Sequence, residues 1–438
     1  MAALEAGALI VGALCVAVML SLPVAFAFLL ISIFGMMILV GGDAGFKQIV
    51  LNGADAVTNF SLLPLPMFFL MGELFFRTGL AHRVFDALDA LFGNVQARLS
   101  YITVAGGTIF AALTGSSLGN SARLGASLAP EMVRRGYKRH MALGPIVAAG
   151  GVGMLIPPSV LAVLFGSIAR IDIGRLLLAG LLPGLILALL YAAAIWTMAR
   201  LDPDAAPRGP GIQPRSMKDV VRMVAVNLLP MLLIVGLVLF VIVYGIATPT
   251  EAAAFGVLGV LCLALAFRCL TIQSMIQALQ GTVAVSGRIL MIIIGSSTFG
   301  QVLALSGATQ AFVGLLSDLE IGRYGFLLLV LVLLLFLGMI MEPLSIMLLT
   351  VPILFPAMQV YGFDPIWFGI FMLLMIEISL ATPPFGLLLF VMQGAAPKGT
   401  TLLQVVRASL PFVGCDLVCV GIITAFPIVV LLLPGLMD

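Results

Sequence analysis

Residues 150–159, Gly-Gly-Val-Gly-Met-Leu-Ile-Pro-Pro-Ser, interrupt an otherwise apolar stretch long enough to cross a membrane. Two consecutive prolines remove amide donors and free upstream carbonyls, and the glycines let the backbone open. The segment therefore predicts a membrane helix that breaks midway. A second segment of this kind, Ile-Ser-Leu-Ala-Thr-Pro-Pro-Phe-Gly, occupies residues 378–386. One Pro-Pro pair could be only a kink, but two at corresponding positions indicate paired sites where freed carbonyls hold a cation.

The rest of the chain has the composition of a helical membrane protein. Its 438 residues are 62% hydrophobic and only 9% charged, with a mean hydropathy of +1.25. A crossing helix needs about 20 apolar residues. Charge-free runs of that length lie at residues 102–122, 141–169, 176–199, 223–250, 289–317 and 378–397. The uncharged run 6–42 is too long for one crossing, so Ser21-Leu22-Pro23 should divide it; it also lacks the basic start of a signal peptide.

Charge and cysteine content argue against several other classes of protein. The net charge of +2 is too small to suggest nucleic acid as a partner. The five Cys lie in apolar runs without the flanking residues of a metal site, so we interpret them as packing residues. An intramembrane enzyme is disfavoured because His82 and His140 fall in predicted loops and no nucleophile has a plausible base. A channel is also disfavoured, because the sequence has no evident filter-like segment.

The distribution of basic residues predicts a hairpin that enters the membrane without crossing it. Three segments rich in Lys and Arg should face the cytoplasm, namely 77–98, 134–139 and 200–222. The first two can share that side only if the stretch 101–130 between them enters and leaves there. Its Gly-, Ser- and Asn-rich tip suits a buried polar turn better than a lipid-facing helix. An ordinary kinked helix is the alternative.

A faint duplication relates the two halves of the chain. The matched pairs, at shifts of 226 or 228 residues, are Gly72 with Gly300, Gly79 with Gly307, Pro130 with Pro356, Gly136 with Gly362, Pro157-Pro158 with Pro383-Pro384, and Pro183 with Pro411. An odd number of crossings in each half would place the second copy upside down relative to the first. Such inverted repeats are a transporter architecture.

We therefore predict an all-α polytopic membrane fold of two inverted-topology repeats, each with about five crossing helices, one re-entrant hairpin and one Pro-Pro broken helix. The first repeat covers residues 1–200, with scaffold helices in 1–98, a hairpin at 99–130, a broken helix at 141–169 and a helix at 175–200. A cytoplasmic linker follows at 201–222. The second repeat covers 223–438, with scaffold helices in 223–268, a helix at 283–307, a hairpin at 324–359, a broken helix at 365–394 and a helix at 403–434.

Ionisable residues inside the spans are candidates for function, because burying them is costly. Arg123 follows the polar tip of the first hairpin, where its planar guanidinium could bind a substrate carboxylate or take a structural role by pairing or snorkelling. Glu342, near the centre of the second hairpin, and Glu377, just before the second break, could contact neighbouring helices or bind protons. Glu73 and Glu251 are isolated, which favours packing or domain contacts.

These motifs resemble the large membrane subunit of tripartite ATP-independent periplasmic (TRAP) transporters, the DctM or SiaM type, over essentially the whole chain. The resembling stretches are Thr-Gly-Ser-Ser-Leu-Gly-Asn-Ser from Thr114, Arg-Gly-Tyr from Arg135, Gly-Met-Leu-Ile-Pro-Pro-Ser from Gly153, Thr-Pro-Thr-Glu-Ala-Ala-Ala from Thr248, Glu-Pro-Leu-Ser from Glu342, Pro352 through Pro356, and Ala-Thr-Pro-Pro-Phe-Gly from Ala381. The resemblance implies an elevator-type carrier driven by a Na⁺ gradient, without ATP or a cofactor.

The resemblance also implies partners and a location. A separate small membrane subunit of the DctQ or SiaQ type supports the scaffold, and a periplasmic binding protein delivers the substrate. That substrate is commonly an organic acid, such as a C4-dicarboxylate, sialic acid or another sugar acid. The chain should span the lipid bilayer of the bacterial inner membrane many times, with both termini periplasmic. The nearest alternative is a one-component carboxylate or ion carrier of related architecture that works without a binding protein.

Carried over motif by motif, the resemblance assigns two sodium sites and no other metal. The first site uses Ser116, Ser117 and Asn120 with backbone oxygens of Gly153, Ile156 and Pro158. The second site uses Gly338, Glu342, Ser345, Ser379, Thr382 and Phe385. The substrate residues are Arg123 and Ser159. The first tip departs from the family at Leu118-Gly119-Asn120, and Arg123 stands where a small residue is common.

Overall fold

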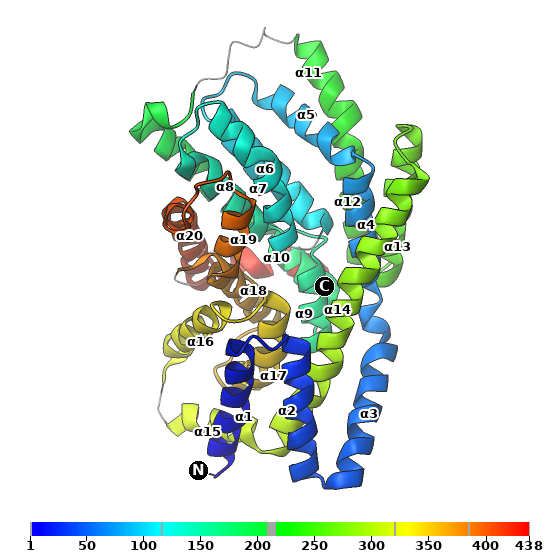
Figure 1. Cartoon of the computed structure of the whole chain (residues 1–438), viewed down its shortest axis with the longest axis vertical. Helices are drawn as coiled ribbons and strands as arrows, with labels where there is room; N and C mark the ends of the chain where they lie inside the picture. Colours follow the sequence, from blue (N-terminus) through cyan, green and yellow to red (C-terminus); the bar gives the residue numbers. More distant parts are fainter. Residues whose placement is uncertain (1, 115–116, 208–215, 319–320, 384–385, 438) are drawn as a thin grey trace.

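The computed structural model describes residues 2–114, 117–207, 216–318, 321–383 and 386–437, and all regular structure among them is helical (Figure 1). Six helices in these ranges are long and apolar enough to cross a membrane, and shorter apolar helices accompany them. The predicted all-α polytopic membrane fold is therefore confirmed.

The first half contains ten α-helices and two short 3-10 turns among its described residues. They are α1 (Ala2–Met19), α2 (Val24–Leu39), α3 (Gly42–Thr58), η1 (Phe60–Leu62), α4 (Pro64–Arg77), α5 (Leu80–Phe92), α6 (Arg98–Thr114), α7 (Ser117–Arg134), α8 (Arg139–Val152), α9 (Val160–Ala169), α10 (Ile173–Leu201) and η2 (Pro203–Ala205). The break between α1 and α2 falls at Ser21-Leu22-Pro23, as predicted: Ser21 has a φ of +65° and Pro23 precedes the first residue of α2.

The second half follows the same order of elements. They are α11 (Met217–Met223), the π-helical η3 (Val224–Leu228), α12 (Leu229–Val243), α13 (Pro249–Ala266), α14 (Ile272–Leu305), α15 (Ala308–Asp318), α16 (Arg323–Gly338), α17 (Pro343–Val360), α18 (Pro365–Ala381), α19 (Leu387–Ala395), α20 (Leu402–Ala425), α21 (Ile428–Leu431) and η4 (Pro434–Met437). In both halves two consecutive helices (α6–α7, α16–α17) precede a helix that is broken in two (α8–α9, α18–α19).

Three helices differ in extent from the sequence-based expectation. The second half becomes helical at Met217, inside the predicted linker, and continues through η3 into α12 as one apolar span. α14 begins at Ile272 rather than 283, because Thr271 and Ser274 form a capping box that starts the helix early. α20 ends at Ala425 rather than near 434, since Pro427 cannot continue its hydrogen-bond ladder.

The residues matched by the sequence duplication share local geometry in the structure. Gly79 and Gly307 have φ values of +79° and +72°, and each separates two consecutive helices. Gly136 and Gly362, with φ of +87° and +67°, occupy the turns that lead into α8 and α18. These left-handed conformations favour glycine because a Cβ would be strained there. The two halves therefore carry the same turns at matched positions.

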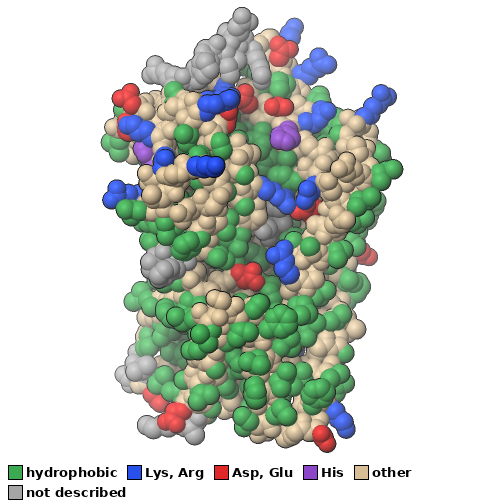
Figure 2. Space-filling view, in the orientation of Figure 1, with side chains coloured by type: hydrophobic (Ala, Val, Ile, Leu, Met, Phe, Trp, Pro, Cys, Tyr) green, Lys and Arg blue, Asp and Glu red, His purple; other side chains and the backbone are tan. Residues whose placement is uncertain are grey.

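The two helices that precede the breaks form the centre of the protein. Every residue of α8 from Met141 to Val152 and of α18 from Trp367 to Ala381 is buried. α14 packs along α2, α3 and α4, and Figure 1 shows it running diagonally beside them. Basic side chains gather toward the end of the molecule that carries α5 and α11, whereas the N-terminus lies at the opposite end (Figures 1 and 2).

Candidate functional site

The main cavity of the protein, about 840 Å³ in volume, lies between elements of both halves. Its wall combines the starts of α7 and α17 with the middle of α4 and of α14. Its charged and hydrogen-bonding side chains are those of Glu73, Ser117, Asn120, Arg123, Arg288 and Glu342. Four of the residues predicted from sequence, Ser117, Asn120, Arg123 and Glu342, thus share one cavity although they come from opposite halves of the chain.

Asn120 anchors the start of α7 and keeps one oxygen unpaired. Its side-chain amide donates a hydrogen bond to the Gly107 carbonyl at 3.0 Å, which ties α7 back to α6. Its Oδ1 atom is buried and has no hydrogen-bond partner among the residues that the structure describes. Because an unpaired buried acceptor costs about 1–3 kcal/mol, this atom is available to a ligand that the cavity admits.

The start of α7 packs directly against the end of α8. A Cβ atom added to Gly150 would overlap the Ser121 hydroxyl and would lie 3.1 Å from the Ser117 carbonyl oxygen. Ser121 in turn donates to the Ile146 carbonyl at 3.3 Å. Glycine at position 150 is therefore what lets the hairpin reach the first break.

The first break runs from Gly153 to Ser159, between α8 and α9. It contains a cis peptide bond between Pro157 and Pro158. Ser159 is fully buried, and its hydroxyl accepts a hydrogen bond from the Ala162 amide at 3.2 Å, which caps α9. Gly153, Ile156, Pro158 and Ser159 do not line the main cavity. The predicted substrate residue Ser159 thus has a capping role in this conformation.

In the second hairpin, residues of the second predicted sodium site lie at the start of α17. Glu342 immediately precedes α17, lines the cavity and makes no capping hydrogen bond with its side chain. Ser345, one turn further, is fully buried, and its Oγ has no hydrogen-bond partner within the described parts of the chain. A Cβ at Gly338 would overlap the Ser379 side chain, so the end of α16 touches the last turn of α18.

Hydroxyl groups near the second break bond back to their own helix. Ser379 donates to the Ile376 carbonyl and Thr382 to the Ile378 carbonyl, each at 2.6 Å. The structure thus brings Gly338 and Ser379 into contact but leaves Thr382 outside the cavity lining. Ser116 and Phe385, which complete the two predicted sodium sites, lie outside the described residues.

Arg123 is committed to an ion pair within the protein. Its guanidinium binds the carboxylate of Glu73 on α4 and stacks over the Phe76 ring, 4.6 Å from the ring centroid. Arg77 Nε binds the other oxygen of Glu73 at 3.2 Å. Of the two sequence-based alternatives for Arg123, structural pairing is the one this conformation displays.

Arg288, the second basic residue that lines the cavity, is not among the residues predicted from the sequence. It lies within α14, whereas the apolar run noted in the sequence begins only at Ile289. Its Nε donates to the Ala284 carbonyl at 3.2 Å, and none of the ion pairs between described residues includes it. The sequence signal that could have revealed Arg288 is that the helical pattern continues on both sides of it.

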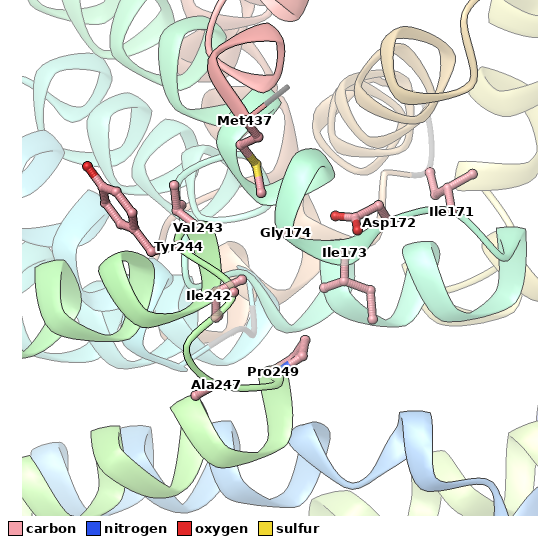
Figure 3. A pocket seen from close by; sticks show the side chains of 11 residues that line it. Ile171, Asp172, Ile173, Gly174, Ile242, Val243, Tyr244, Ala247, Pro249 and Met437 are labelled. Atoms are coloured by element: carbon pink, nitrogen blue, oxygen red, sulfur yellow. The ribbon is translucent and has the colours of Figure 1, made fainter.

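A smaller cavity of about 520 Å³ lies elsewhere, where the turn between α9 and α10 faces the turn between α12 and α13 (Figure 3). Asp172 and Gly174 line one side, Tyr244 and Ala247 the other, and Met437 reaches in from the C-terminal turn. The Asp172 carboxylate already caps α10 by accepting from the Arg175 amide at 2.7 Å. None of the residues predicted from sequence lines this cavity.

Fold and site together define a polytopic helical membrane protein with a cavity between its two halves. The solved structure of the Alcanivorax borkumensis YdaH transporter aligns with a TM-score of 0.60 over 88% of this chain and 89% of that chain. The sequence identity is 13%, so the likeness is one of fold alone. Transporter folds built from two related halves commonly carry their site where helices of both halves approach each other, as the cavity here does.

The family follows from the sequence matches. Residues 11–429 match the family of the tripartite ATP-independent periplasmic transporter, DctM component. The C4-dicarboxylate TRAP transporter large permease protein DctM of Pseudomonas aeruginosa is 33% identical over 390 residues, which cover 89% of this chain and 90% of that protein. The sialic acid TRAP transporter large permease protein SiaM of Vibrio cholerae is 31% identical over 397 residues, 89% of each chain. The chain belongs to this family of transport permeases, which confirms the resemblance seen in its motifs.

Proposed function

We propose that this chain is the membrane subunit through which a TRAP transporter imports an organic acid together with Na⁺. The observation that carries the proposal is the cavity of about 840 Å³ that is lined by the starts of both α7 and α17, the second helix of each hairpin. Its size falls within the range of about 300–1,000 Å³ typical of small-molecule sites, and few but convergent polar groups line it. The relatives named above are called C4-dicarboxylate and sialic acid transporters, and both substrates are carboxylates.

Unpaired oxygens support the assignment of two sodium sites. Na⁺ prefers oxygen ligands, and Asn120 Oδ1 and Ser345 Oγ are buried oxygens without partners, one in each half. We assign the first site to Ser116, Ser117 and Asn120 with backbone oxygens of Gly153, Ile156 and Pro158. We assign the second to Gly338, Glu342, Ser345, Ser379, Thr382 and Phe385. Sodium bound at these tips would hold each hairpin against the helix break beside it.

The division of the cavity wall supports an elevator mechanism. α7 and α17 of the hairpins and α9 of the first broken helix contribute one part of the wall, and α2, α4 and α14 contribute the other. We group the hairpins and broken helices, α6–α9 and α16–α19, as one body. In the proposed cycle the first group moves as a body past the second. The ion pair between Arg123 on α7 and Glu73 on α4 then joins the two groups in the present conformation and must open when they slide. Arg123 becomes available to the substrate in that step.

The distribution of charge supports an orientation in the bacterial inner membrane. The end rich in basic side chains would face the cytoplasm, and both termini would be periplasmic. The small DctQ-type subunit would support the scaffold within the bilayer. A periplasmic binding protein would deliver the acid at the opposite end.

Uptake into proteoliposomes tests the proposal. The chain is reconstituted with its small subunit, and entry of radiolabelled succinate and N-acetylneuraminate is measured with and without binding protein, under an inward Na⁺ gradient or an equal K⁺ gradient. We expect uptake that requires both the binding protein and Na⁺. Equal uptake without the binding protein would instead favour a one-component carrier, and uptake that ignores Na⁺ would overturn the coupling.

A matched pair of serine variants tests the ion assignment. Ser345→Ala removes a buried hydroxyl that lacks a partner, so we expect the Na⁺ concentration for half-maximal uptake to rise roughly tenfold, as for the loss of one ligand worth about 1.4 kcal/mol. Ser297→Ala removes an exposed hydroxyl of α14 that bonds only to the Ile294 carbonyl, and should leave this concentration unchanged. An equal shift in both variants would remove Ser345 from the proposed site.

A further inference from the structure

Arg288 is a charged residue inside a helix that is long and apolar enough to cross a membrane. It stands in the middle of the 34-residue helix α14, the longest of the membrane-crossing helices among the described residues. At a rise of about 1.5 Å per residue, its Cα lies roughly 25 Å along the helix from either end. A charged side chain inside a membrane-crossing helix usually faces a cavity or a partner. Arg288 is exposed and lines the main cavity.

Arg288 has no ion-pair partner among the described residues. Within the described parts of the chain no acidic group forms an ion pair with it, and its one hydrogen bond is donated by Nε to the Ala284 carbonyl. The acidic residues that line the cavity are Glu73 and Glu342. Glu73 is occupied by Arg77 and Arg123, and Glu342 interacts electrostatically with Arg288 without reaching ion-pair distance.

The two arginines of the cavity therefore differ in what they offer a ligand. Arg123 has its guanidinium on Glu73 and its face on Phe76. Arg288 forms no ion pair with a carboxylate of the described residues. Two parallel N–H groups of a guanidinium match the two oxygens of a carboxylate, which gives a short and charge-assisted contact.

We propose that Arg288 binds the carboxylate of the transported acid on the α14 side of the cavity. The inference rests on the proposed function and names the residue that recognises the acid. The neighbouring Gly287 leaves room for this ligand, because a Cβ added there would meet no atom within 4 Å. Apolar side chains of Phe69, Ile289 and Met291 line the same cavity and would contact the carbon skeleton of the acid.

Equilibrium binding tests the inference without requiring transport. The purified complex of this chain and its small subunit, in sodium-containing detergent buffer, is titrated with succinate, fumarate, N-acetylneuraminate and glucuronate, and the melting temperature is followed. Succinamide serves as the uncharged analogue of succinate. We expect at least one acid to raise the melting temperature of the wild type, and succinamide to have no effect.

Three variants locate the binding residue. Arg288→Gln should weaken the binding of that acid roughly tenfold or more, and Arg288→Lys, which keeps the charge but loses the fork, should retain part of it. Arg407→Gln removes an exposed arginine of α20 outside the cavity and should bind as the wild type does. Wild-type affinity in Arg288→Gln would overturn the inference, as would the absence of a shift with every acid.

The same titration separates this inference from the proposed function. If an acid binds through Arg288 but its uptake ignores Na⁺ or the binding protein, the anion site stands and the proposed coupling fails. If uptake depends on both while Arg288→Gln binds and transports normally, the coupling stands and the carboxylate is bound elsewhere.

Discussion

Glu73 and Glu377 are both buried carboxylates in apolar helices, yet their surroundings are opposite. Glu73 on α4 is 9% exposed and binds two arginines, Arg77 of its own helix and Arg123 of α7. Glu377 on α18 is 3% exposed, lies against Gly151 at the end of α8, and has one oxygen without a hydrogen-bond partner. No cation pairs with Glu377 among the described residues.

The group that interacts electrostatically with Glu377 is another acid. Asp416 on α20 is also buried, and it accepts a hydrogen bond from the Tyr191 hydroxyl. Burying a carboxylate without a cation costs several kcal/mol, whereas an uncharged acid avoids most of that cost. The comparison teaches that burial alone does not define the role of an acid: Glu73 joins two parts of the protein as a charge, and Glu377 suits its site as a neutral group.

The largest expected effect comes from filling the space that Glu377 occupies. A Cβ atom at Gly151 would overlap the Glu377 carboxylate, and both residues sit on fully buried helix segments that cannot shift easily. We expect Gly151→Ala to lower the free energy of unfolding by about 2–3 kcal/mol, the upper part of the range for overpacked cores. Melting of the detergent-solubilised protein, followed by size-exclusion chromatography, measures the loss.

A second variant checks that the clash is with Glu377. In the double variant Gly151→Ala with Glu377→Ala the carboxylate is gone, so part of the lost stability should return. Gly414→Ala is the matched control, because a Cβ at this position in α20 would meet nothing within 4 Å. A Gly151→Ala protein as stable as the wild type would show that the two helices are not in close contact here.

An intermediate effect is expected at the paired acid. Glu73→Gln keeps the shape of the side chain but removes the charge that Arg77 and Arg123 share, so we expect a loss of about 1–2 kcal/mol in melting experiments, since both arginines are partly exposed. High salt should reduce the difference between variant and wild type. Glu5→Gln, an exposed acid of α1, is the control with no expected loss beyond a few tenths of a kcal/mol. If Glu73→Gln lost no more stability than Glu5→Gln, the ion pairs of Glu73 would contribute nothing to the stability of the protein.

Local chemistry made much of the fold predictable from sequence. The Pro-Pro segments indicate breaks because proline removes a donor wherever it stands. In the structure α8 ends at Val152 and α18 at Ala381, inside these segments and before the prolines. The duplication was visible in Gly79, Gly136 and their partners because these turns require a left-handed residue. Such signals need no knowledge of the tertiary structure.

The site was less predictable because its contacts join distant residues. Glu73 seemed isolated in the sequence, yet it pairs with Arg123, fifty positions away. Arg288 was missed because a charge beside an apolar run resembles the end of a span; only the early start of α14 at the Thr271 capping box shows that it lies inside. Which residues form an ion pair, and whether a charge lies inside a helix, depend on how the helices pack. Composition and residue spacing do not reveal this packing.

The smallest effect is expected at the unpaired acid, where the comparison is sharpest. If Glu377 is held uncharged, the amide of Glu377→Gln replaces it with a side chain of the same shape and no charge, so stability should stay within about 0.5 kcal/mol of the wild type. Of the two variants Glu377→Gln and Glu73→Gln, the first should have the melting temperature closer to that of the wild type. A loss that equals or exceeds that of Glu73→Gln would contradict this view, because it would mean that Glu377 carries a charge with a counter-ion. Repeating the measurement in sodium-free buffer then decides whether that counter-ion is Na⁺, since only in that case would the difference between Glu377→Gln and the wild type disappear with the ion.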